Sequence, residues 1–316
     1  MTAAAALRRS GRHTDGRQRV MAAGFLNRYA EAAGDMEHGA RLAERAGDTA
    51  SWNRAMSNLA SILVTIDASA AAAASRSAID GARQLGNRFQ LAVAIPNLAM
   101  ALMFSGDWVE AERVLAEAIE ADGFDDDSLI SGYVAMAAAA LACLRGDRAA
   151  IDATHSAFTD MRASEDPQDL AAAAFVDALQ AAGRGRQEDV LRHVRSILGY
   201  ASALGIASEY PNWAWPLGVR AAFELGDDAA VEELLVLLDG YPSGHIPPLL
   251  RAERALARAR QRVAARQSDA DTALEAAVAE LRAVASPYHL AHALLDQAEY
   301  LAGAGRSGEA EISVPA

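Results

Sequence analysis

The sequence predicts an all-α protein, a solenoid of about eight helix-turn-helix hairpins. Three observations lead to this prediction. Apolar and small residues recur at helical spacing along nearly the whole chain. Short turn-forming pairs recur about every 40 residues. Aromatic residues make up only 6% of a chain dominated by alanine, and small side chains allow the close helix approach that stacked hairpins need.

The stretch Leu91–Glu120 shows the repeating unit most clearly. Its first half carries apolar or small residues with helical periodicity, and its second half repeats this pattern after Gly106-Asp107. Gly106 can adopt the left-handed conformation that ends a helix, and Asp107 can cap the start of the next one. Such a hairpin cannot bury its apolar stripe alone, so it requires neighbours of the same kind.

Related turns divide the whole chain in the same way. They occur at Gly34-Asp35, Asp67, Gly106-Asp107, Gly146-Asp147, Gly185-Arg186, Gly226-Asp227, Gln267-Ser268 and Gly305-Arg306. Their spacings are 33, 39, 40, 39, 41, 41 and 38 residues. Glycine or proline marks each break between hairpins, at Gly47, Gly86, Gly123, Pro167, Gly205, Pro242 and Pro287. The predicted hairpins are 17–46, 50–85, 88–121, 128–163, 168–204, 211–239, 247–285 and 288–316.

The hairpins form one continuous body in this prediction. Residues 1–15 are expected to be a frayed lead-in, and residues 16–316 a single solenoid with an incomplete last hairpin. The second helix of that hairpin has barely ten residues, whereas an array normally closes with a complete polar cap. The C-terminus therefore looks truncated or frayed, and the last hairpin could pair with another copy to form a homodimer.

Composition argues against several classes of function. The net charge of −13 and the pI near 5.0 disfavour nucleic acid as a partner, because binding phosphates requires a basic face. No stretch approaches the ~20 consecutive apolar residues of a membrane span. The single cysteine, Cys143, is expected to be an inert buried thiol, and a cytoplasmic location fits. All 29 basic residues are arginine, which a GC-rich coding bias of the actinobacterial kind would produce.

The central hairpin combines small, aromatic and acidic residues at fixed spacing, namely Asn97, Leu98, Ala99, Leu102, Gly106, Asp107, Trp108, Glu110, Ala111 and Ala118. This pattern resembles a tetratricopeptide repeat (TPR), with a longer period than the usual ~34 residues. It is similar to TPR-like regions of MalT-like or LuxR-type regulators and of actinobacterial adenylate-cyclase and ATPase signalling proteins. The resemblance implies a right-handed superhelix with a concave binding surface. The phosphate-binding GxxxxGK loop of an attached ATPase is absent from the sequence.

The most unusual stretch is 210–216, which holds two tryptophans and two prolines. Aromatic residues on the first helices of such an array can face the concave groove and anchor a peptide or a ring-bearing ligand. We therefore name Tyr210, Asn212, Trp213 and Trp215 as candidate ligand contacts. The alternative is that these side chains fill the core between two hairpins.

Other candidate sites are weaker. His289 and His292 are three residues apart on a predicted helix, a spacing that suits one metal ion, but no nearby cysteine or further histidine completes a site. Arginines within 251–262 form a basic face that could meet an acidic partner. We favour local pairing of this face with Glu253 and Asp269. We find no catalytic set and expect no cofactor and no metal.

The leading functional hypothesis is a non-catalytic protein-interaction module of a signal-transduction or transcriptional regulator, which binds a protein or peptide segment in its concave groove. The alternative is a small-ligand sensor that controls an attached ATPase or adenylate cyclase. An enclosed apolar pocket near Trp213 and Trp215 would favour the sensor, and an open polar groove would favour the interaction module.

Overall fold

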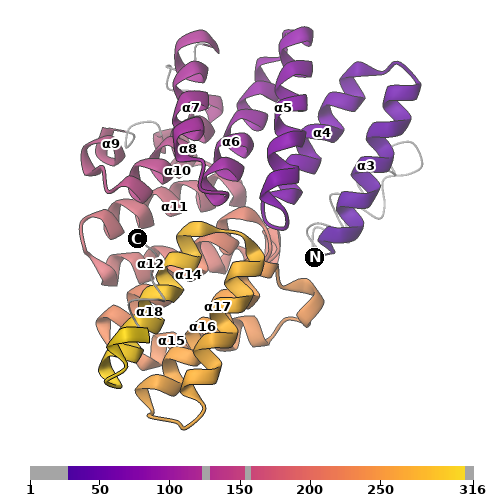
Figure 1. The fold of residues 1–316 in the computed structure, drawn as a ribbon. Coiled ribbons are helices and arrows are strands. Elements are labelled where there is room, and N and C mark those ends of the chain that lie inside the picture. Colours follow the sequence, from indigo (N-terminus) through magenta and orange to yellow (C-terminus); the bar gives the residue numbers. More distant parts are fainter. Residues whose placement is uncertain (1–27, 123–128, 154–157, 310–316) are drawn as a thin grey trace.

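The computed structural model describes residues 28–122, 129–153 and 158–309, and all regular structure within these ranges is helical. In Figure 1 the chain runs from the indigo α3 through the magenta helices to the yellow α18. The helices are α3 (Tyr29–Arg45), α4 (Thr49–Leu63), α5 (Ala68–Leu85), α6 (Arg88–Phe104), α7 (Trp108–Asp122), α8 (Leu129–Arg145), α9 (Arg148–Ala153), α10 (Thr159–Ala163), α11 (Pro167–Gly183), α12 (Gln187–Gly199), α13 (Ala201–Leu204), α14 (Glu209–Leu225), α15 (Asp228–Asp239), η2 (Ser243–His245), α16 (Pro248–Ala264), α17 (Ala270–Val284) and α18 (Pro287–Gly303).

The predicted turn chemistry is confirmed at the central hairpin and at two of its relatives, Gly146-Asp147 and Gly226-Asp227. Gly106 has a φ of 84°, and Asp107 accepts a hydrogen bond of 3.3 Å from the backbone N–H of Glu110 at the start of α7. The same arrangement recurs at Gly226, with a φ of 66°, where Asp227 caps α15 at 2.9 Å. Glycine relieves the strain of the left-handed conformation, and the aspartate satisfies an N–H group that the helix leaves unpaired.

The prediction of a turn at Gly34-Asp35 is wrong, because α3 continues through both residues. Ala33, Met36 and Ala40 are buried on one face of this helix. Burying that stripe outweighs the roughly 1 kcal/mol that a glycine costs within a helix. The chain turns instead at Gly47, with a φ of 67°, a position that the sequence had suggested as a break between hairpins. Residues 17–27 of the predicted first hairpin lie outside the described residues.

Neighbouring helices pack in sequence order. Each of α3 to α6 packs against the next helix, as do α11 with α12 and α16 with α17. Alternate helices also meet, so that α6, α8, α11, α14 and α16 form a chain of contacts that continues to α18. These alternate helices supply the side chains of the site described below. None of the described helices combines the length and apolar character needed to cross a membrane.

The start of α18 lies against the end of α6. A Cβ atom on Gly106 would lie 2.9 Å from Cγ of Pro287, which is closer than real side chains allow. The ring of Phe104 stacks on the imidazole of His289, with 6.1 Å between centroids and 10° between planes. Segments about 180 residues apart in the sequence are therefore in contact, and this contact closes one side of the site.

Candidate ligand-binding site

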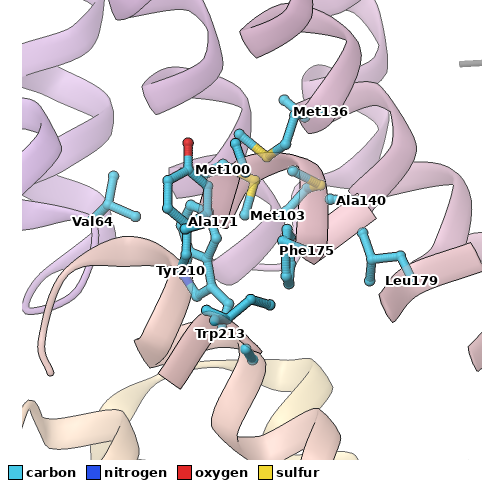
Figure 2. Close-up of a cluster of buried hydrophobic side chains, with 14 of the residues drawn as sticks. Val64, Met100, Met103, Met136, Ala140, Ala171, Phe175, Leu179, Tyr210 and Trp213 are labelled. Atoms are coloured by element: carbon cyan, nitrogen blue, oxygen red, sulfur yellow. The ribbon is translucent and has the colours of Figure 1, made fainter. Parts of the chain in front are cut away.

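An aromatic cluster lies where α6, α11 and α14 meet. The indole of Trp213 lies at its centre, with ring centroids 5.7 Å from Phe104, 5.8 Å from Phe175 and 6.1 Å from Tyr210. Figure 2 shows Trp213, Phe175 and Tyr210 gathered close to the sulfur atoms of Met100, Met103 and Met136. Tilted and edge-on ring pairs at these separations are the arrangements that aromatic quadrupoles favour.

The rings of Phe104, Phe175 and Trp213 also line a cavity of about 100 Å³, which we call the apolar pocket. Its walls come from α6, α8, α11, α14 and the start of α18, and most of its lining side chains are apolar. It is lined by Met100, Met103, Phe104, Ala140, Cys143, Leu144, Phe175, Leu179, Trp213, Pro216, Leu217, Arg220, Ser286, Tyr288 and His289. Its size and lining suit an apolar group no larger than a single ring.

A second cavity of about 330 Å³, the acidic pocket, shares Met100 and Trp213 with the first. Its other lining residues are Ser61, Phe89, Ala92, Val93, Pro96, Asn97, Tyr133, Met136, Gln168, Asp169, Glu209 and Tyr210. Pockets that bind small ligands are commonly about 300–1,000 Å³ and carry a few polar groups in a largely apolar lining. The acidic pocket has both properties.

Two carboxylates give the acidic pocket its charge. Asp169 accepts hydrogen bonds from the hydroxyl of Tyr133 at 2.7 Å and from the hydroxyl of Ser164 at 2.8 Å. Glu209 is half-buried, and burial raises its pKa from 4.5 to about 7. Burial and the nearby carboxylates also raise the pKa of Tyr133 and Tyr210, so both phenols stay neutral at physiological pH.

Several buried polar atoms at this site have no hydrogen-bond partner within the described part of the chain. They include the indole N–H of Trp213 and the amide nitrogen of Asn97, both on side chains that line the acidic pocket and are 8% exposed. The hydroxyl of Ser286, in the apolar pocket, likewise finds no partner among the described residues. Because leaving such a group unpaired costs about 1–3 kcal/mol, unpaired donors on side chains that line a cavity point to a ligand or water that satisfies them.

A buried ionic cluster borders the apolar pocket. The carboxylate of Glu253 on α16 accepts a hydrogen bond of 2.7 Å from the guanidinium of Arg220 on α14, and lies 2.5 Å from Nδ1 of His289 on α18. Burial alone would raise the pKa of Glu253, but Arg220 and His289 outweigh it and hold that pKa at about 2. This cluster joins three helices and fixes the position of α18 against the pocket.

The four residues predicted from the sequence are all buried, and the structure gives them different surroundings. Trp213 and Tyr210 line the acidic pocket, and Trp213 also lines the apolar pocket. Trp215 is completely buried, and its indole N–H donates a 2.9 Å hydrogen bond to the carbonyl of Leu234 on α15. Asn212 is also fully buried. A ligand contact therefore stays a prediction for Tyr210 and Trp213, whereas Trp215 packs between α14 and α15.

The other candidate groups have structural surroundings of their own. Among the described residues, no three histidine, cysteine, aspartate or glutamate side chains are grouped as a metal site would require. His289 pairs with Glu253, so the expected pairing of Glu253 with the arginines of 251–262 is wrong. Asp269 forms an ion pair with Arg262, so the expected pairing of the basic face with Asp269 is confirmed.

Sequence reasoning missed Phe89, Tyr133, Asp169 and Glu209, which complete the acidic pocket. They lie on four different helices and share no local pattern, so only the packing of the helices brings them together. A scan of the sequence against protein-family models gives no match, and neither does a search of curated proteins. The site's function must therefore be argued from its own chemistry.

Proposed function

We propose that this chain is a non-catalytic, TPR-like helical-repeat domain that senses a small ligand held between its helices. The proposed body is a right-handed superhelix of about eight hairpins, belonging to a cytoplasmic signal-transduction or transcriptional regulator. The observation that carries the proposal is the pair of adjoining pockets that share Met100 and Trp213.

The position of the pockets supports a sensor. A ligand there would touch side chains from α6, α8, α11 and α14, and in the apolar pocket also from α18. A ligand shifts a conformational equilibrium when its contacts differ between the two states. Because these helices come from successive hairpins, a ligand between them would favour one relative arrangement of the hairpins. An attached ATPase or adenylate cyclase could respond to that change.

The proposal can be tested with benzyl alcohol, a small neutral probe that carries one ring. We expect a saturable change in tryptophan fluorescence that disappears in Trp213→Phe. Ala140→Phe, which places a ring in the apolar pocket, should abolish binding. The control Ala116→Phe makes the same change at an exposed position on α7 and should bind like the parent chain. Absence of saturable binding to a folded parent chain would contradict the proposal.

A second candidate is the protein-interaction module with a peptide in its groove. It is favoured by Phe89, which lines the acidic pocket and is 60% exposed, because a partner's apolar side chain could pack on its ring. The two candidates differ in what saturates the site. A sensor is saturated by a small molecule alone, whereas an interaction module requires a peptide of several residues.

A further inference from the structure

We propose that the acidic pocket binds a small organic cation, an ammonium or quaternary ammonium group that carries an apolar substituent. This inference rests on the proposed ligand-binding function and adds the chemical class of the ligand. It is based on aromatic rings, carboxylates and unpaired donors that surround one cavity of about 330 Å³.

The aromatic rings are the first part of the evidence. Phe89 on α6, Tyr133 on α8, and Tyr210 and Trp213 on α14 all line the pocket. The face of an aromatic ring is electron-rich, and a cation within about 6 Å of the ring centroid is attracted to it, most strongly by tryptophan. Several rings around one cavity are typical of sites that hold quaternary ammonium groups.

The charge of the pocket is the second part. Asp169 and Glu209 both line it, and its described lining includes neither arginine nor histidine. Asp169 already accepts hydrogen bonds from Tyr133 and Ser164. We therefore assign Glu209 as the carboxylate that faces the cation. Arg220, in the adjoining pocket, is already paired with Glu253.

The rest of the lining defines the remainder of the ligand. Within the described residues, the amide nitrogen of Asn97 and the indole nitrogen of Trp213 are buried donors without partners, so a hydroxyl or carbonyl oxygen on the ligand would satisfy them. Met100 and Trp213 also line the apolar pocket, where an apolar substituent of the ligand would be held.

The test compares benzyltrimethylammonium with benzyl alcohol, which carries the same ring without the charge. Binding is measured by calorimetry on the full chain at pH 8. We expect the cation to bind at least tenfold more tightly than the alcohol. In Glu209→Gln the affinity for the cation should fall about tenfold while the affinity for benzyl alcohol stays the same. Glu188→Gln removes an equal charge at an exposed position on α12 and should keep the advantage.

The exposed ring at the rim of the pocket offers a second variant. Phe89→Leu keeps an apolar side chain but removes the aromatic face, and Phe89 is exposed enough that folding should not depend on it. We expect this variant to weaken binding of the cation severalfold and to leave binding of the alcohol nearly unchanged, because only the cation is attracted to the ring quadrupole.

The affinity for the cation should also depend on pH. The groups that face Glu209 are Tyr29 on α3, Tyr133 on α8, Asp169 on α11 and Tyr210 on its own helix. The three phenols stay neutral between pH 6 and 8 because their pKa values are raised. Since the pKa of Glu209 is about 7, its ionised fraction rises from roughly 0.1 to roughly 0.9 over this range. Binding should therefore strengthen about tenfold from pH 6 to pH 8, and Glu209→Gln should show no such change.

The possible failures have different meanings. If benzyl alcohol binds and benzyltrimethylammonium binds no more tightly, the cation inference is wrong and the proposed sensor function survives. An unchanged preference for the cation in Glu209→Gln would also overturn the inference. If neither probe binds the folded chain, both the inference and the proposed function are wrong.

Discussion

The ionic cluster of Arg220, Glu253 and His289 gives the sharpest prediction about stability. Glu253→Gln removes the negative charge from a side chain that is 1% exposed and leaves the guanidinium of Arg220, 14% exposed, without its carboxylate. It also removes the charged acceptor that faces His289. Because these three residues join α14, α16 and α18, we expect the substitution to lower the free energy of unfolding.

The size of this effect follows from the pKa of Glu253. Its value of about 2 in the folded protein compares with 4.5 for a free glutamate. A difference of about 2.5 pKa units corresponds to ~3 kcal/mol, and removing one partner of a buried ion pair commonly costs ~3–5 kcal/mol. We therefore expect a loss of about 3 kcal/mol at pH 7.5. Since the folded pKa is the lower one, the contribution is complete above pH 4.5 and disappears as the pH falls through about 2.

Urea unfolding followed by circular dichroism measures this loss. The control is Glu233→Gln, which breaks an exposed pair with Arg195 whose side chains are 53% and 45% exposed. Exposed pairs contribute about 0–1 kcal/mol, so the control should change stability little. The double variant Arg220→Met, Glu253→Gln should lose less than the sum of the two single variants, because the second change no longer leaves an unpaired charge. A loss below 1 kcal/mol for Glu253→Gln, or strict additivity in the double variant, would refute this reasoning.

Three further predictions concern the fold. In urea unfolding, Gly106→Ala should cost about 2–3 kcal/mol and Gly305→Ala only about 1 kcal/mol. Both glycines have a positive φ, but only at Gly106 would the new methyl group meet Pro287. Trp215→Phe should cost about 2–3 kcal/mol, since it leaves a cavity and removes the hydrogen bond that the indole donates to the carbonyl of Leu234 on α15; an unchanged midpoint would contradict its buried position. Burial and Arg220 lower the pKa of His292 to about 4, so on acidification from pH 6.5 to 4 this residue should contribute a loss of about 2 kcal/mol of stability, opposite in sign to the contribution of Glu209. His292→Gln should remove most of that pH dependence.

Much of the helix pattern could be predicted from the sequence because it depends on local chemistry. A glycine that ends one helix and an aspartate that caps the next act within a few residues of each other, as Gly226 and Asp227 do. The same signal misled at Gly34-Asp35, where the buried faces of Ala33 and Met36 keep the helix intact. Local turn residues indicate where a helix can end, but tertiary burial decides whether it does.

The site was predictable only in part. The unusual composition of 210–216 identified Tyr210 and Trp213, which do line a cavity. The sequence could not separate them from Trp215, because a helix turns 100° per residue and neighbouring side chains face different surroundings. Glu253 pairs with Arg220 and His289, which lie 33 and 36 residues away from it on other helices. No local pattern in the sequence therefore predicts this cluster.

The most direct test of ligand binding between these helices uses Cys143, which lines the apolar pocket and is the chain's single cysteine. Burial raises the pKa of its thiol to about 11, so N-ethylmaleimide at pH 8 should react roughly two orders of magnitude more slowly than with a free thiol. Saturating benzyl alcohol should slow this reaction at least a further tenfold. Labelling at the rate of an exposed thiol, or at a rate that the probe leaves unchanged, would contradict the proposal that small molecules bind in this pocket.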